Sequence, residues 1–488
     1  MNLAGKAISL DRLKRRALSL SAVKSFDHAM RFVLPVLLVR CLDTASFGEY
    51  RLLWLAVGTV MLVATLNMCG GLYFWLPRSE PRRKRLYIHQ TMLFVAISGL
   101  AWGFFVSPWN PALPAPLRHL EPHGLLVPAF LALWVVGALM DFLPSVDERI
   151  RWQAYATWSV SALRALVVGL GAWLTGELRV VLWLLVAVVL FKVLLLLYYV
   201  RRWHGLGPPW FERAAFSAQF RHSAPIGLSN ALSGLKRNAD QWVVASLFAV
   251  SSFAAFSIAA LVGQMMTIVR RSVMEAFLPS MSRLQATGDV RGMLKMNSRG
   301  NVMVGRLLYP LLAFVFVFAE ELVTVVYTAA YVEAAPVMRV YIIGMLPLAV
   351  EIASLVLLLR RGKYALVVSG FILVLSVGCS WIGAQQLGLP GAAAGSVLSV
   401  YVNRVLMLRH VAQHTGIALR RLQDWRSLAT ALALAAVTAA LAFVFVERFF
   451  ADDGPLVRLA AGGAVFALAY AATYVRFALS ITRNKDAT

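Results

Sequence analysis

The chain has 488 residues, of which 60% are hydrophobic and 14% are charged, and its mean hydropathy is +0.72. These values lie outside the range of soluble domains and predict an all-α polytopic membrane protein. The formal net charge of +24 has the sign that nucleic-acid binding needs. Because no soluble basic face with aromatic or groove-reading motifs accompanies it, we expect no nucleic-acid partner. Cys41, Cys69 and Cys379 have neither metal-ligand spacing nor an evident pairing, which is typical of packing residues.

The N-terminal residues 1–21 are basic and lack a small-residue cleavage site after a short apolar core. We therefore expect a retained cytoplasmic tail and no signal peptide. Segments long and apolar enough to span a bilayer follow, and they predict about 14 transmembrane helices. These segments are 22–42, 50–76, 86–107, 124–144, 154–174, 178–200, 223–248, 253–279, 301–320, 336–359, 364–386, 391–410, 427–447 and 457–477.

The order of these segments predicts two six-helix bundles, at 22–200 and 223–410, joined by a basic cytoplasmic connection at 201–222. Residues 411–488 add two transmembrane helices and a cytoplasmic tail. Placing 46–50 over 252–256 sets an offset of 206 residues, which brings Arg31 onto Arg237. Matched halves of this kind indicate parallel repeats around a central cleft.

Charge is distributed unequally over the connections. With the N-terminus placed inside, every basic cluster falls on the cytoplasmic side and the acidic loops fall on the other, which predicts that both termini are cytoplasmic. The inner clusters contain Arg82, Arg83, Lys84, Arg85, Arg201, Arg202, Arg283, Arg291, Lys295, Arg360, Arg361, Lys363, Arg420 and Arg421. The outer loops contain Glu320, Glu321, Glu333, Asp452 and Asp453.

A polar stripe marks the first apolar segment. Its members are Lys24, Asp27, His28 and Arg31. Spacings of three and four residues place them on one face of a helix, where each charge at lipid depth would cost roughly 2.5 to 3.5 kcal/mol. The stripe therefore predicts a polar cavity, with Lys24 and Arg31 as cations of a substrate site. The alternative is that Lys24 and Arg31 extend to the interface and that Asp27 only pairs with Arg31.

A second stripe follows the seventh segment, where Arg237 and Asp240 recur at helical spacing. In the eighth segment, Arg270 and Arg271 are further candidates for the cationic cleft, or else anchors at the helix end. Glu275 could equally pair with Arg271.

Four intramembrane acids are candidates for coupling transport to a proton or sodium gradient. They are Asp27, Asp240, Glu275 and Glu351. The alternative is that Asp27 and Asp240 merely neutralise a basic neighbour within one turn. The isolated charges Arg164, Lys192, Arg306, Arg339 and Arg404 are expected to anchor helix ends or to pair between helices.

Small residues and prolines indicate where helices bend or pack closely. Pro35 and the glycine-rich start of the seventh segment, at Gly227 and Gly234, are the bending points that rocking of two bundles would use. Gly391 and Gly395 form a small-x-x-x-small pair that close helix packing explains without any function.

Several stretches resemble motifs of the polysaccharide transporter family, the Wzx-like flippases of the multidrug/oligosaccharidyl-lipid/polysaccharide (MOP) superfamily. The stretch 38–50, LVRCLDTASFGEY, is similar to the turn after the family's first helix. The stretches 240–244, 278–282 and 323–335 are similar to later motifs in the same order, although Thr328 stands where the family usually has glycine. The resemblance spans about residues 20–410.

The resemblance implies a flippase that moves undecaprenyl-diphosphate-linked oligosaccharide repeat units across the bacterial inner membrane by alternating access, for O-antigen, capsule or exopolysaccharide export. Arg31, Arg237, Lys24, Arg270 and Arg271 would then surround the diphosphate, because arginine donates to phosphate oxygens while staying charged. Alternatives are a cation-coupled multidrug antiporter of the same superfamily and a lipid II flippase. We expect no enzyme activity, no metal and no cofactor beyond the coupling ion. A polysaccharide polymerase and a chain-length regulator are candidate partners.

Overall fold

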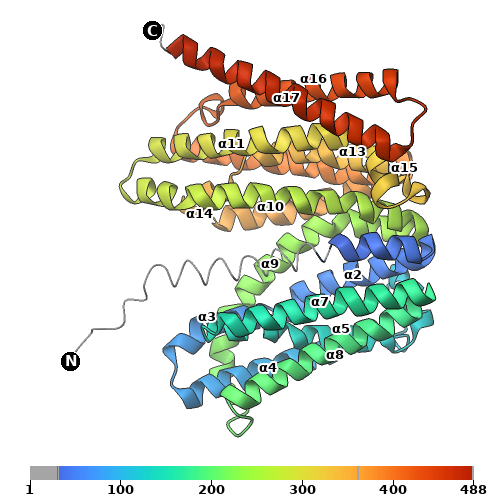
Figure 1. The fold of residues 1–488 in the computed structure, drawn as a ribbon. Helices are drawn as coiled ribbons and strands as arrows, with labels where there is room; N and C mark the ends of the chain where they lie inside the picture. Colours follow the sequence, from blue (N-terminus) through green and yellow to red (C-terminus); the bar gives the residue numbers. More distant parts are fainter. Residues whose placement is uncertain (1–29, 31, 360–361, 486–488) are drawn as a thin grey trace. The chain divides into compact units, whose positions relative to one another are not determined.

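The structure is a computed structural model that describes residue 30, residues 32–359 and residues 362–485 (Figure 1). Lys24, Asp27, His28 and Arg31 lie outside this part of the chain. Within it, the only regular elements are α-helices and short 3-10 helices, and ten helices are long and apolar enough to cross a membrane. The predicted fold class, an all-α polytopic membrane protein, is confirmed.

Contacts divide the chain into two compact units, with the boundary between Asn238 and Ala239 inside one long helix. In unit 1, α4 packs on α5, α7 packs on α8, and α5 packs on α8. Its described helices are Phe32–Cys41, α2 (Thr44–Ala64), α3 (Met68–Trp75), α4 (Pro81–Phe105), α5 (Leu126–Gly137), α6 (Leu143–Val146), α7 (Ile150–Thr175), α8 (Leu178–Trp203) and the first part of α9 (Arg213–Leu247).

The predicted span 50–76 is broken. Leu66 and Asn67 separate α2 from α3 and have positive φ values of 40° and 58°. Gly227 of α9 lies against the backbone of Leu66 so closely that a Cβ atom would overlap it. The small residues at the start of α9 therefore allow close backbone approach, and α9 is continuous through this point.

Polar contacts tie the loops at each end of unit 1 together. At one end, Asp43 caps α2 by accepting from the backbone of Ala45 and Ser46, both at 2.9 Å, and Glu49 bonds His123 at 2.9 Å. At the other end, Asp147 accepts hydrogen bonds from Tyr199 and His204, each at 2.7 Å. Burial alone would raise the pKa of Asp147, but the hydrogen bonds from His204 and Tyr199 outweigh burial and hold that pKa below its usual value.

In unit 2, α10 packs on α11, α11 on α16, α13 on α15 and α16 on α17. Figure 1 shows α10, α11 and α13 running alongside one another. The helices are the end of α9, α10 (Val250–Ala286), α11 (Val290–Val317), α12 (Ala319–Val326), α13 (Ala334–Met345), α14 (Ala353–Leu358), α15 (Gly362–Thr415), α16 (Trp425–Phe449) and α17 (Pro455–Lys485).

The element α15 contains two of the predicted spans, 364–386 and 391–410. Gly388, with φ 67° and ψ −146°, interrupts the helical conformation between them. The two halves then approach backbone to backbone, Gly383 against Gly391 and Gly395 against the backbone of Cys379. The close packing expected at Gly391 and Gly395 is thereby confirmed, and α15 is a tight helical hairpin.

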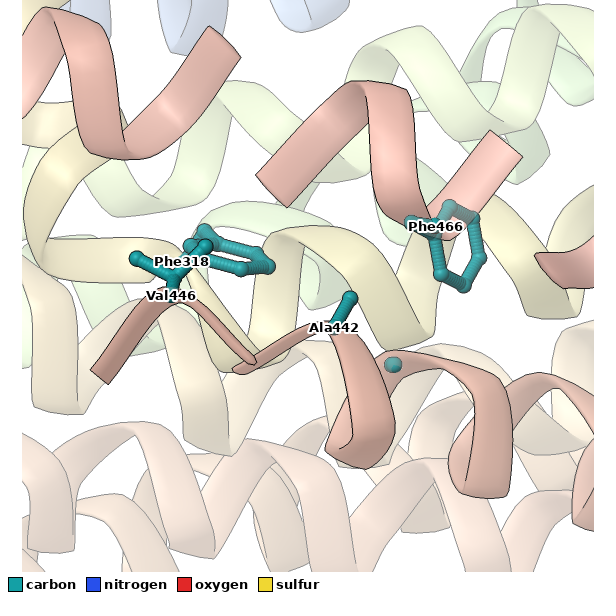
Figure 2. Packing of buried hydrophobic residues seen from close by; sticks show 5 residues of the cluster. Phe318, Ala442, Val446 and Phe466 are labelled. Atoms are coloured by element: carbon teal, nitrogen blue, oxygen red, sulfur yellow. The ribbon is translucent and has the colours of Figure 1, made fainter. Parts of the chain in front are cut away.

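The last two helices of unit 2, α16 and α17, pack on the end of α11 through an apolar cluster (Figure 2). Phe318, at the end of α11, is fully buried among Ala439, Ala442 and Val446 of α16, and Phe466 of α17 completes the cluster. Alanines on α16 let the helix come close to the ring of Phe318. The expectation that Arg339 pairs between helices is confirmed, since it bonds Glu320 at 2.9 Å.

Candidate functional site

Unit 2 contains a break between two helices, and the candidate site lies around this break. The chain leaves the helical path at Val350–Ile352, between the 3-10 turn Leu346–Ala349 and α14. Inside a membrane, backbone groups freed by a break must find partners within the protein. Asn301 of α11 accepts from the Glu351 amide at 3.0 Å, and Asn297 donates to the Glu351 carbonyl at 3.2 Å. Two asparagines on α11 therefore replace the hydrogen bonds that the helix lacks.

The Glu351 carboxylate is fixed by the same break. It is buried and accepts from the backbone of Ser354 at 3.2 Å, as a cap at the N-terminus of α14. The Arg270 guanidinium on α10 lies 4.0 Å from it. Two residues that the sequence assigned to separate roles, a substrate cation and an ion-coupling acid, thus form one ion pair between helices.

A second arginine belongs to this group. Arg404, in the second half of α15, interacts electrostatically with both Arg270 and Glu351. Its Nε atom is buried and has no hydrogen-bond partner in the described part of the protein. Two guanidinium groups therefore lie within electrostatic range of one carboxylate at a helix break, and we call Arg270, Glu351 and Arg404 the arginine cluster. A phosphate group matches this arrangement, because it offers several oxygens to planar donors.

Asp240 is the second buried acid of unit 2. It lies on α9, 3% exposed, and accepts a hydrogen bond of 2.7 Å from the Tyr341 hydroxyl on α13. The backbone amide of Gln241 also donates to its carboxylate, at 2.8 Å. Asp240 therefore links α9 to α13 through a hydroxyl group, an environment in which a carboxylate can exchange a proton or a small cation.

Unit 1 contains a small polar cavity of about 50 Å³. The Lys192 ammonium on α8 bonds Asp141 at 2.7 Å and lies 5.3 Å from the centre of the Trp134 ring. Arg164 on α7 lines the same cavity and is 6% exposed, with its guanidinium 5.9 Å from the centre of the Trp54 ring. The expectation that Lys192 pairs between helices is confirmed.

The structure does not bring the other predicted site residues into this cluster. Lys24, Asp27 and Arg31 lie outside the described residues, as does the side chain of Arg271. Arg237 and Glu275 are exposed on α9 and α10. Their assignment to a common cationic cleft therefore stays a prediction.

Two elements of the site were not identified from the sequence. Arg404 was expected to anchor a helix end or to pair between helices, but no neighbour on its own helix indicates which residues it would meet. Asn297 and Asn301 did give a signal, since two amides one helical turn apart are unusual on the face of an apolar helix. That spacing could have located the break, although not the residue it supports.

Comparison with known proteins covers most of the chain. Residues 37–336 match the family model described as polysaccharide biosynthesis protein. No curated protein sequence matches the chain significantly.

Solved structures extend the likeness. The structure titled lipid II flippase MurJ, inward closed conformation, has a TM-score of 0.70 at 11% identity and covers 94% of this chain and 99% of its own. The MATE multidrug transporter DinF-BH, solved in complex with a ligand, has a TM-score of 0.58 at 12% identity, over 85% of this chain and 98% of its own. A MATE transporter of the MOP superfamily in an inward-facing conformation has a TM-score of 0.56 at 15% identity, over 80% and 95%.

These likenesses agree in fold with the motifs of the sequence, and the family match covers more than half of the chain. The family match confirms the predicted polysaccharide family, and the fold is that of MOP-superfamily transporters. The chain belongs to the polysaccharide biosynthesis protein family and is a multi-pass membrane protein with the MOP transporter fold.

Proposed function

We propose that this protein is a flippase that moves undecaprenyl-diphosphate-linked oligosaccharide repeat units from the cytoplasmic to the periplasmic leaflet of the bacterial inner membrane. The exported product would be O-antigen, capsule or exopolysaccharide. Membership in the polysaccharide biosynthesis protein family supports a glycan cargo. The inner-membrane location is part of this proposal and rests on the family. The cytoplasmic placement of both termini is also part of it and rests on the basic loops.

The arginine cluster is the observation that carries the proposal. Arg404 places a guanidinium with a buried, unbonded Nε atom beside the Arg270–Glu351 pair. A charge in a membrane span is costly, so it is usually retained for a function. A diphosphate would take hydrogen bonds from Arg404 and Arg270, while Glu351 holds Arg270 in place. Lys24, Arg31, Arg237 and Arg271 are the further cations that we propose for the path of the diphosphate.

The test is translocation of a fluorescent polyprenyl diphosphate oligosaccharide by the full-length protein in proteoliposomes. Arg404→Ala should lower the translocation rate at least about tenfold, because charge-assisted hydrogen bonds contribute roughly 1.5 to 3 kcal/mol. Arg404→Lys should retain part of the rate, since it keeps the charge but not the planar fork.

Arg409→Ala is the matched control, because Arg409 is an exposed arginine on the same helix. It should translocate at the wild-type rate, and all three variants should insert in equal amounts. A wild-type rate for Arg404→Ala would contradict the proposal. Faster transport of lipid II than of the oligosaccharide lipid would favour the peptidoglycan precursor, and exchange of organic cations alone would favour the multidrug antiporter.

A further inference from the structure

A continuous groove runs between α11, α16 and α17 of unit 2. It consists of two adjoining cavities, of about 810 Å³ and 330 Å³, and both are lined by Arg306 and Ser427. The larger cavity lies at the end where α11 and α16 begin and is lined by polar residues of both helices. The smaller cavity continues along α16 beside Tyr470 and is lined mainly by apolar side chains. The lining of the smaller cavity includes Ala431, Ala433, Leu434 and Val437.

The wide end of the groove is cationic. Lys295, Arg299 and Arg306 are spaced by four and seven residues, so they share one face of α11, and all three line the larger cavity. None of the three forms an ion pair within 4 Å in the part of the chain that the structure describes. Three positive side chains therefore face one cavity without a counter-charge bound to any of them.

The one carboxylate at this end is already engaged. Asp424 caps α16, accepting from the Ser427 amide at 3.0 Å and from the Ser427 hydroxyl at 2.6 Å. These hydrogen bonds hold the pKa of Asp424 below its usual value, so the cap stays ionised at neutral pH. The carboxylate orients α16, and the groove keeps a net positive charge.

Contacts between α11, α16 and α17 border the groove. The Tyr470 hydroxyl donates to the Arg306 carbonyl at 3.3 Å, which holds α17 beside α11. Further along, the cluster of Phe318, Ala442 and Phe466 joins α11, α16 and α17 (Figure 2). Phe318 is 12 residues beyond Arg306, about 18 Å of helix rise. The apolar slot itself is lined from Ser427 to Val437, ten residues or about 15 Å of helix rise, which is long enough for most of one extended acyl chain.

We propose that this groove binds an anionic phospholipid of the surrounding bilayer. Its phosphate would bond Lys295, Arg299 and Arg306, and one acyl chain would lie along Ala433 and Val437. Cationic pockets between transmembrane helices attract anionic headgroups, each nearby cation contributing about 1 kcal/mol. A soluble anion would leave the slot unused, and a zwitterionic lipid would not match three cations. The same lipid would contact and stabilise α11, whose Asn297 and Asn301 hydrogen-bond the backbone at the Glu351 break.

The experiment is native mass spectrometry of the full-length protein in micelles that contain equal amounts of phosphatidylglycerol and phosphatidylcholine. The wild-type protein should retain phosphatidylglycerol in preference. The triple variant Lys295→Ala, Arg299→Ala, Arg306→Ala should lower the phosphatidylglycerol-bound fraction at least about tenfold. Ala433→Trp, which fills the slot and leaves the cations intact, should lower it as well.

Two variants serve as controls. Arg291→Ala removes an exposed cation from the same end of α11 that does not line the cavity, and Ala436→Trp adds the same bulk at an exposed position of α16 outside the slot. Both should retain lipid as the wild type does. Unchanged retention by either the triple variant or Ala433→Trp would overturn the proposal, as would full displacement of the lipid by inorganic phosphate. Displacement by a polyprenyl diphosphate at equal concentration would also overturn it, because the groove would then belong to the cargo.

Discussion

Thr328 has backbone angles that only glycine adopts without strain, φ 103° and ψ 159°. It lies in the tight turn between α12 and the 3-10 turn Ala329–Tyr331. The motif that this stretch resembles usually has glycine here, and the structure gives the physical reason. A side chain in this conformation costs of order 1 to 3 kcal/mol, which the packing around the turn must offset.

Thr328→Gly should therefore raise the stability of the protein by about 1 kcal/mol. The gain is smaller than the strain it removes, because glycine loses roughly 0.5 to 1 kcal/mol more backbone entropy on folding. The measurement is the midpoint of thermal unfolding in detergent. Thr324→Gly, the same substitution inside α12, should lower that midpoint. A lower midpoint for Thr328→Gly would show that this turn is not strained.

At the scale of single elements, the α15 hairpin depends on glycine for a different reason. Gly395 is not strained, but its Cα lies so close to the Cys379 and Ser380 backbone that a Cβ atom would overlap both. Gly378 is on the opposite half of the hairpin and has open space around it. Two glycines in the same hairpin thus have opposite tolerance to the addition of one methyl group.

Gly395→Ala should lower stability by roughly 1 to 3 kcal/mol, because the two halves of α15 must separate to admit the methyl group. Gly378→Ala should leave stability unchanged or raise it by up to about 1 kcal/mol, since alanine favours helix. Unfolding of the two variants in a denaturing detergent titration measures the difference. Equal effects would mean that the hairpin does not require backbone contact.

The sequence predicted the spans well because each is a run of about 20 apolar residues, and such a run specifies its own helix. It did not predict the break at Leu66 and Asn67, since that conformation depends on Gly227 in α9. The arginine cluster was missed for the same reason. Arg270, Glu351 and Arg404 come from three helices, and spacing along one helix does not reveal a contact between helices.

At the scale of the whole molecule, each unit contains buried charge in its own interior. Unit 1 has the buried cations Arg164 and Lys192, and unit 2 has the arginine cluster and the acid Asp240. Charge at these depths is retained at a cost in stability, so a transport function is the expected reason for keeping it. Asp240 differs from the others because neutral groups, the Tyr341 hydroxyl and the Gln241 amide, donate to its carboxylate.

If Asp240 carries the coupling ion, an imposed proton or sodium gradient should accelerate translocation in proteoliposomes. Asp240→Asn should remove this acceleration and leave downhill exchange intact, because the amide oxygen still accepts from Tyr341 while the charge is lost. Glu275→Gln, at an exposed position, should respond to the gradient as the wild type does. Loss of the response in Glu275→Gln alone would assign the coupling to Glu275.

The tip of α15 has a consequence for how the protein is made. Residues 385–390, Gln-Gln-Leu-Gly-Leu-Pro, contain no charge that could hold a loop outside the membrane during synthesis, and Leu387 is exposed at the turn. The nearest arginines follow at Arg404 and Arg409, on the same side as the start of the hairpin. The basic residues of the hairpin stand at its inner end, with Lys363 at the start of the first half and Arg409 near the end of the second. We therefore expect the two halves to enter the lipid together, as one hairpin whose basic inner end stays in the cytoplasm.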